Sequence, residues 1–196
     1  MVPAVGSQFP EETYMKKTVL TFGFISGAIA SLLMTVTMLL SDRIGFERGY
    51  FVGYATIVLS LLLVFFGVRS YRDNVGNGQI TFGKAFVVGI LITVISCVCY
   101  VAAWEILYFN FMPGFMDKWT AYTVQKLQAS GASSAAIAEK VEQMKKYKEM
   151  YDNPLTNAAM TFIEPFPVGL LMTLISAAVL RRKEQGQGTR APVAAA

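Results

Sequence analysis

The sequence predicts an all-α integral membrane protein with four transmembrane helices and an amphipathic helical hairpin between the third and the fourth. Hydrophobic residues make up 54% of the 196-residue chain and charged residues 15%, whereas soluble domains carry about 25% charged residues. The apolar residues are gathered into four long runs, and about 20 apolar residues suffice to cross the ~30 Å hydrocarbon core of a bilayer. The lipid bilayer is therefore the first partner that we predict.

The first span is predicted over residues 18–40, a run without charged residues. Lys16-Lys17 before it and Ala28-Ile29-Ala30 inside it would also fit a cleaved signal peptide. The apolar run continues well past that small-residue site, which a signal peptide does not need, so we favour a span. Residues 1–15 carry no sustained periodicity and are predicted to be a disordered leader.

The other three spans are predicted over residues 49–68, 85–111 and 155–180. Pro113-Gly114 ends the third span, because proline cannot continue a helix. Asn153-Pro154 begins the fourth, since asparagine is a favoured N-cap and proline is well tolerated at the first helical position. Each of these runs is long enough to cross a bilayer.

Residues 115–152 differ from the spans, because their charges alternate and no apolar run is long enough to cross. Ser130-Gly131 divides the segment into two predicted helices, and in the second helix apolar residues recur at helical spacing. The aromatic residues of the first helix are expected to lie on the membrane surface or to cap the bundle; they are Phe115, Trp119 and Tyr122. We expect an amphipathic hairpin outside the bilayer.

The basic residues predict the orientation, because cytoplasmic flanks of spans carry an excess of Lys and Arg. That excess flanks the start of the first span, the loop between the second and third spans, and the end of the fourth. Both termini are therefore predicted to be cytoplasmic and the hairpin extracytoplasmic. Residues 16–183 would form one membrane domain, and residues 184–196 a disordered cytoplasmic tail. Because the basic residues lie beside the spans rather than in one block, we expect no nucleic-acid binding.

No catalytic constellation is visible in the sequence. The chain has no histidine, which removes the commonest general base and a favoured metal ligand. Cys97 and Cys99 lie two residues apart in a helix and point in different directions. Residues 78–85 resemble the start of a phosphate-binding loop but end in Ala85, where a hydroxyl is needed. We predict no metal, no cofactor and no enzymatic activity.

Small residues at four-residue spacing predict close helix packing in two spans. Gly23 and Gly27 form one such pair in the first span, and Gly49 and Gly53 form another in the second. In lipid, small residues allow helix backbones to approach closely. The pattern fits packing within one bundle and also fits dimerisation between two chains.

Glu164 is the strongest candidate for a functional residue. It lies up to ~13 Å beneath the outer end of the fourth span, at ~1.5 Å per residue, where an ionisable group costs at least ~2.5 kcal/mol on insertion scales. Pro165 and Pro167 follow it and are expected to break or kink the helix. A carboxylate beside broken helix backbone is typical of an ion or proton site. A structural hydrogen bond to a hydroxyl or to freed backbone is the alternative.

Glu105 is the second candidate acid, close to the outer end of the third span. Trp104, Tyr108 and Phe109 surround it in the sequence and are typical of an aromatic belt at the membrane interface. An interfacial carboxylate that faces water is the alternative to a functional role.

A resemblance to a known family covers the chain from Lys16 to Lys183. The segments that carry it are Phe66-Gly67-Val68-Arg69-Ser70-Tyr71-Arg72-Asp73, Ile80-Thr81-Phe82-Gly83-Lys84-Ala85-Phe86, Glu105, and Glu164-Pro165-Phe166-Pro167-Val168-Gly169 ahead of Arg181-Arg182-Lys183. In these segments the chain resembles a family of small bacterial inner-membrane proteins known as domain of unknown function 4199. The resemblance implies four spans and the bacterial inner membrane. It implies no activity, so no functional residue is transferred from it.

Two functions remain open at this point. The first hypothesis is a non-enzymatic envelope interaction or sensing protein that binds an extracytoplasmic protein through residues 115–152. The alternative is a small ion- or proton-coupled transporter or channel subunit that uses Glu164, as a homo-oligomer because four spans make a narrow pathway. A Glu164 that water can reach favours transport, whereas one wholly packed on apolar side chains favours the first hypothesis.

Overall fold

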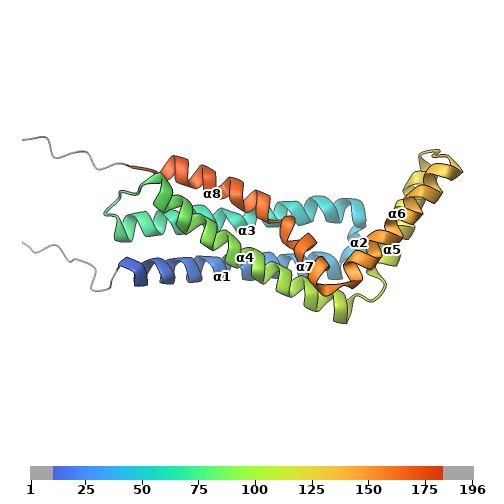
Figure 1. The fold of residues 1–196 in the computed structure, drawn as a ribbon, viewed down its shortest axis with the longest axis horizontal. Helices are drawn as coiled ribbons and strands as arrows, with labels where there is room; N and C mark the ends of the chain where they lie inside the picture. Colours follow the sequence, from blue (N-terminus) through green and yellow to red (C-terminus); the bar gives the residue numbers. More distant parts are fainter. Residues whose placement is uncertain (1–10, 183–196) are drawn as a thin grey trace, which may run out of the picture.

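The computed structural model describes residues 11–182, so the predicted leader over residues 1–10 and the predicted tail over residues 184–196 lie outside the described residues. Within this range the chain folds into eight helices (Figure 1): α1 (Glu11–Leu39), α2 (Ser41–Ile44), α3 (Phe46–Val75), α4 (Phe82–Phe111), α5 (Phe115–Ala129), α6 (Ser134–Asp152), α7 (Pro154–Ile163) and α8 (Phe166–Leu180).

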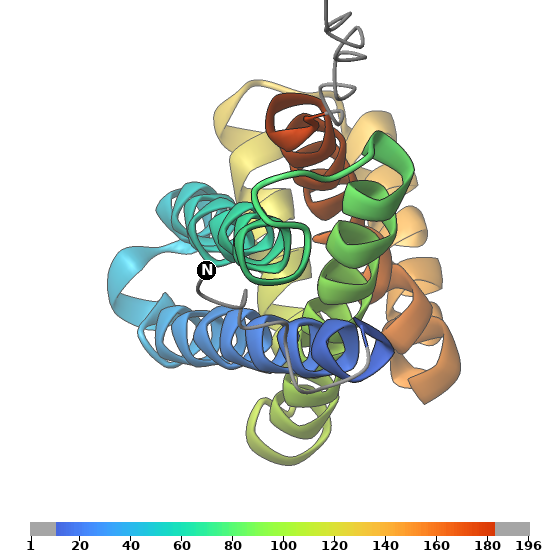
Figure 2. The same cartoon turned by 90° about the vertical axis from the view of Figure 1, so that its left-hand side faces the viewer.

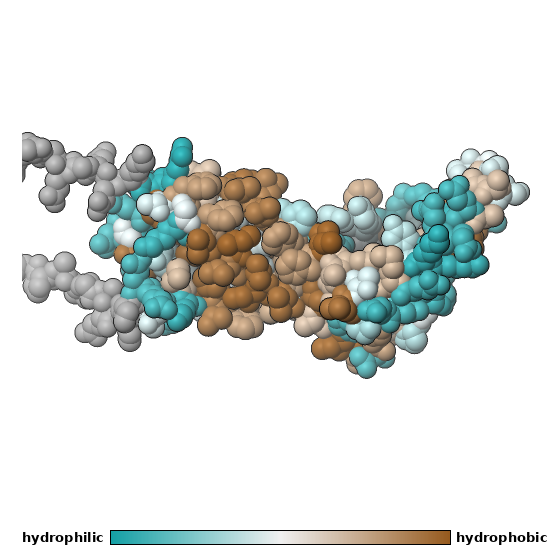
Figure 3. Space-filling view, viewed as in Figure 1, coloured by the Kyte–Doolittle hydropathy of each residue, from teal (hydrophilic) through white to brown (hydrophobic). Residues whose placement is uncertain are grey.

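Four helices are long and apolar enough to cross a membrane, which confirms the predicted fold class. They are α1, α3, α4 and the α7–α8 pair, Pro154–Leu180. Figure 3 shows a broad hydrophobic band around the middle of the bundle, with hydrophilic residues gathered at both ends. That distribution suits a bundle whose flanks contact lipid and whose ends contact water.

The bundle has two distinct ends (Figure 1). The start of α1, the loop between α3 and α4, and the end of α8 lie together at the terminal end, while α2 and the α5–α6 pair lie at the hairpin end. Backbone hydrogen bonds of 3.0 and 3.2 Å between Ile80 and Arg182 tie the α3–α4 loop to the end of α8. Both ends of the described chain, Glu11 and Arg182, therefore lie at one end of the bundle.

Helices α1, α3 and α4 extend further at the terminal end than the sequence predicts; α4 begins at Phe82, and the longer extensions are those of α1 and α3. Helix α1 begins at Glu11, so the predicted disordered leader is wrong for residues 11–15. The Glu11 carboxylate accepts hydrogen bonds from the Tyr71 hydroxyl, at 2.9 Å, and from the Lys84 ammonium group. These partners lie far away in the sequence, and they hold the polar first turns of α1 against the bundle.

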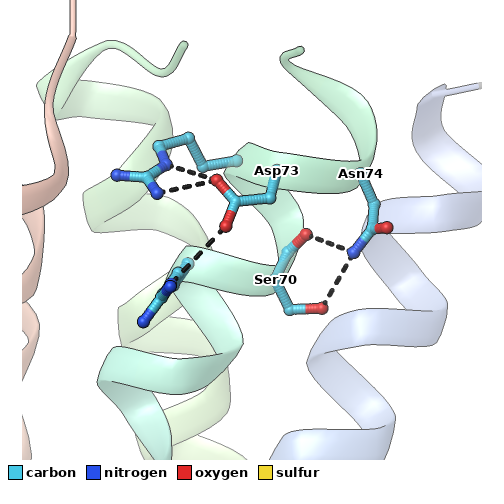
Figure 4. Close-up of polar contacts among 5 residues, drawn as sticks. Ser70, Asp73 and Asn74 are labelled. Atoms are coloured by element: carbon cyan, nitrogen blue, oxygen red, sulfur yellow. Dashed lines mark hydrogen bonds and ion pairs between the residues drawn. The ribbon is translucent and has the colours of Figure 1, made fainter. Parts of the chain in front are cut away.

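Helix α3 likewise continues past residue 68 to Val75. Figure 4 shows the polar contacts of this last part: Asp73 pairs with Arg72 at 2.7 Å and with Arg69 at 3.5 Å, and Asn74 donates to the Ser70 carbonyl at 2.8 Å. Such side-chain pairs support helical turns that project beyond the apolar band.

Helix α4 is the central helix, because it packs against α1, α3, α7 and α8. At Gly23 and Gly27 the backbone of α1 approaches α4 closely: a Cβ added there would lie 2.8 Å from Ile95 or 2.6 Å from Cys99. This is the packing that the small-residue spacing predicts. Gly49 and Gly53 differ, since an added Cβ would meet nothing within 4 Å. No other helix of the described residues packs on these two glycines, and their packing against a second chain stays a prediction.

The fourth span is broken where the sequence places its two prolines. Helix α7 ends at Ile163, Glu164 and Pro165 form a turn, and α8 begins at Phe166. Pro165 and Pro167 lack the N–H groups that a continuous helix would need here. The two halves pack differently: α8 lies against α3 and α4, while α7 lies against α4 and α6. Figure 2, viewed from the terminal end, shows α7 displaced from α8 toward the far side of α4.

Helices α5 and α6 pack against each other at the hairpin end. Gly131, with a φ of 76°, makes the turn between them, and Lys148 pairs with Asp117 across the pair at 2.6 Å. This hydrogen bond raises the pKa of Lys148. Met116 and Met144 are buried, and the Trp119 ring lies 5.2 Å from the Phe46 ring of α3. The apolar faces of the two helices therefore pack on the bundle.

Candidate functional site

A cavity of about 480 Å³ lies at the hairpin end of the bundle. Side chains from α1, α3, α4, α5, α6 and α7 line it. Sites for small molecules are of this kind, with volumes of roughly 300–1,000 Å³ and mostly apolar walls. The cavity is therefore the candidate site.

Three features of the chain create this space. The break after Ile163 lets α7 pack against α4 and α6, whereas α8 packs against α3 and α4. Gly49 and Gly53 line the cavity from α3 and add no side chain to fill it. The α5–α6 pair covers the space with Met116, Trp119 and other residues. Within this chain, the two glycines of α3 thus leave room for the cavity.

Glu164 lines this cavity from the break in the fourth span. Helix α7 has 10 residues, which places Glu164 ~15 Å along the helix from its start at 1.5 Å per residue. Its Oε2 accepts a hydrogen bond from the Tyr100 hydroxyl at 3.3 Å, and within residues 11–182 it has no ion-pair partner. The residue is exposed to the space of the cavity rather than enclosed in apolar packing.

The walls of the cavity are mainly aromatic rings and methionine side chains. They are Phe46, Tyr50, Tyr100, Trp104, Phe115, Trp119, Tyr147 and Tyr151, with Met34, Met38, Met116, Met144 and Met160. Burial, and then the charge of Glu164, raise the pKa of the Tyr151 hydroxyl. Aromatic rings and thioethers together make an adaptable apolar wall with electron-rich faces.

The terminal half of the bundle is tightly packed and does not continue the cavity. Val64, Val68, Val88 and Ile92 are 0% exposed in α3 and α4. The Ser26 hydroxyl donates to the Ser60 carbonyl at 2.8 Å and shares a 2.9 Å hydrogen bond with Ser96. Buried hydroxyl groups in this half bond to a neighbouring helix or, as Ser60 and Ser176 do, to a carbonyl of their own helix. The residues that line the cavity do not extend into this packed core.

A second space of about 580 Å³ adjoins the cavity between α3 and the α5–α6 pair. Phe46, Tyr50, Trp119, Thr123 and Lys140 line both spaces, so the two spaces are direct neighbours. At its outer part Glu47 of α3 pairs with Lys126 of α5 at 3.2 Å, which raises the pKa of Lys126. This exposed ion pair links the hairpin to the bundle.

The structure separates Glu105 from Glu164. Glu105 does not line the cavity, and its Oε1 atom is buried without a hydrogen-bond partner among residues 11–182. A carboxylate oxygen that faces water, the alternative suggested by the sequence, is therefore not found for this atom. The two acids form no joint site.

Asn157 is a site residue that the sequence reasoning missed. It is fully buried in α7, and its Oδ1 accepts hydrogen bonds from Trp104 Nε1 at 2.9 Å and from the Thr161 hydroxyl at 3.1 Å. Its Nδ2 donates to the Tyr151 carbonyl at 3.0 Å. Asn157 therefore joins α7 to α4 and to the end of α6, beside the cavity wall. An amide inside an apolar run is the signal that could have identified it.

Within the described range, no group of three or more His, Cys, Asp and Glu residues could hold a metal ion. Glu164 is the acidic residue among the cavity walls, and the site offers no further carboxylate as a second ligand.

Comparison with known proteins assigns the chain at the level of the family. The sequence profile of the family described as "Protein of unknown function (DUF4199)" matches residues 21–182. The chain belongs to this family. The match includes the broken fourth span and the whole cavity of this DUF4199 protein. No curated protein and no solved structure matches the chain. What the site can do therefore has to be argued from its geometry.

Proposed function

We propose that this DUF4199 protein is a small-molecule carrier of the membrane. Its substrate binds in the cavity at the hairpin end, Glu164 is the ionisable contact, and the α5–α6 pair is a cap. The observation that carries the proposal is that Glu164 lines a roomy cavity, whereas a carboxylate with a purely structural function would be enclosed by hydrogen-bond donors.

The closed terminal half supports a carrier rather than an open channel. A channel needs a continuous pathway, but the packed residues of α3 and α4 leave none below Glu164 within the described residues. A carrier exposes its site to one side at a time and moves its helices around it. The break at Pro165 gives the fourth span a point at which α7 can move relative to α8.

For the orientation we propose that both termini are cytoplasmic and that the membrane is a bacterial inner membrane. The excess of basic residues beside the ends of the spans supports the first part. In this orientation the cavity opens to the extracytoplasmic side, beneath the hairpin.

Envelope interaction through the hairpin is the second candidate function. The observation in its favour is the strongly charged outer face of α6, which carries Glu139, Glu142, Lys145 and Lys146 and appears hydrophilic in Figure 3. The apolar faces of α5 and α6 are already packed on the bundle. A protein partner would therefore have to bind the charged face.

Flux into proteoliposomes tests the proposal. The purified protein is reconstituted, and the flux of a panel of labelled small organic solutes, neutral, anionic and cationic, is compared among the wild type, Glu164→Gln and Glu105→Gln at matched incorporation. We expect flux in the wild type and in Glu105→Gln and its loss in Glu164→Gln, since Glu105 is a span carboxylate outside the cavity. Flux that is absent from the folded wild type, or that Glu164→Gln retains, contradicts the proposal.

A further inference from the structure

The charges of the cavity are separated along its length. Glu164 lies at the closed end, at the break in the fourth span. Lys140 is the basic residue of the lining. It lies in α6, twelve residues before Asp152, the last residue of that helix, which is ~18 Å along the helix at 1.5 Å per residue. It also lines the adjoining outer space and contacts Gln143 at 3.5 Å. The inner part of the cavity is therefore electronegative.

Aromatic faces surround the same inner part. Tyr100 contacts Glu164 directly, and Trp104 and Tyr151 belong to the helices packed against α7. The Tyr50 ring lies 4.8 Å from the Tyr54 ring on the α3 side. An aromatic face attracts a cation within about 6 Å of its centroid, most strongly when the cation has lost its water.

The walls favour an organic cation over an inorganic one. A metal ion needs several oxygen ligands, and carboxylates are preferred among them. Glu164 is the acidic residue of the lining, and no second carboxylate of the described residues lines this cavity beside it. The methionine side chains add apolar surface and no charge.

From these three observations we infer that the ligand of the cavity is a hydrophobic organic cation, such as a quaternary ammonium compound or a protonated amine with apolar groups. Its charge contacts Glu164, and its apolar groups lie against the aromatic rings and methionines. The inference rests on the proposed function and names the substrate class of that site.

The test uses tetraphenylphosphonium as the cation and tetraphenylborate as an anion of the same shape. The chain has 2 tryptophans, and both Trp104 and Trp119 line the cavity, so intrinsic fluorescence reports on its occupancy. The purified full-length protein in detergent is titrated with each probe, as the wild type, Glu164→Gln and Glu105→Gln.

We expect the cation to quench the fluorescence of the wild type and of Glu105→Gln saturably. Its affinity for Glu164→Gln should be at least about tenfold weaker, because one charge pair in a partly screened site is lost. The anion should show no saturation. Equal affinity of Glu164→Gln and the wild type overturns the inference. Saturable binding of the anion with equal affinity also overturns it, while a small-molecule cavity still stands. The comparison of the cation with the anion uses the wild-type protein alone, so it does not depend on whether a variant folds. Quenching by neither probe overturns the inference, and the flux assay then decides the proposed function alone.

Discussion

The two glycine pairs of the sequence should respond to the same substitution with opposite signs. Gly27→Ala places a Cβ 2.6 Å from Cys99 Cβ and 3.2 Å from Ser96 Cα. Non-bonded carbon atoms prefer about 3.5–4.0 Å, so α1 and α4 must separate by about 1 Å. Gly53→Ala places its Cβ beside the cavity, where nothing lies within 4 Å.

The magnitude follows from the contacts around Gly27. Overpacking a well-packed interior costs about 1–3 kcal/mol. The separation also stretches two hydrogen bonds: the one between the Ser26 and Ser96 hydroxyls, now 2.9 Å, and the one that Ser31 donates to the Cys99 carbonyl, now 3.2 Å. Each contributes about 0.5–1.5 kcal/mol. The better helix propensity of alanine returns up to about 1 kcal/mol. We expect Gly27→Ala to lower the free energy of unfolding by about 1–4 kcal/mol and Gly53→Ala to raise it by about 0.4–1 kcal/mol.

Unfolding in mixed micelles of a mild detergent and SDS, followed by circular dichroism, measures both changes in the same assay. Gly53→Ala is the matched control, because it makes the same chemical change in the same kind of helix. Equal stability of the two variants would refute the conclusion that α1 is closely packed at Gly27 whereas α3 is not at Gly53. A destabilised Gly53→Ala would contradict the open space beside α3.

Two further predictions concern the hairpin end. Asn157→Leu leaves Trp104 Nε1 and the Thr161 hydroxyl without their acceptor, so the free energy of unfolding should fall by about 1–3 kcal/mol; an unchanged SDS unfolding midpoint would count against the Asn157 network. The pKa of Lys148 is raised in the folded protein by its hydrogen bond with Asp117, so this pair stabilises below the unfolded pKa of about 10.4 and its contribution is lost as the pH rises through the folded value. The melting temperature of Lys148→Met should therefore fall less above about pH 10 than that of the wild type. Identical dependence of the two melting temperatures on pH would show that the Lys148–Asp117 pair does not contribute to stability.

The sequence identifies the spans well, because length and hydropathy act locally along the chain. It misses the start of α1 at Glu11, since the Tyr71 and Lys84 groups that hold this turn come from other helices. The sequence also cannot distinguish the packing of Gly27 from that of Gly53. The spacing shows that small residues share one face of a helix, but it does not show whether another helix packs against that face.

The candidate site is predicted only in part for the same reason. Glu164, Pro165 and Pro167 stand out because a charge and two prolines interrupt an apolar run. The cavity walls come from helices spread along the chain from Met34 to Glu164, and no local pattern signals that they meet. Asn157 was missed because its three hydrogen bonds are visible only in the folded chain.

The central claim is that an open cavity reaches down to Glu164, and thiol accessibility tests it most directly. In a variant with Cys97 and Cys99 replaced by alanine, single cysteines are placed at Gly53, which lines the cavity, and at Ile57, one turn further along α3 and 2% exposed. Both variants, in proteoliposomes, are treated with a small cationic methanethiosulfonate reagent. We predict rapid modification of Gly53→Cys and almost none of Ile57→Cys. Equally slow modification of both would contradict an open cavity in this part of the bundle.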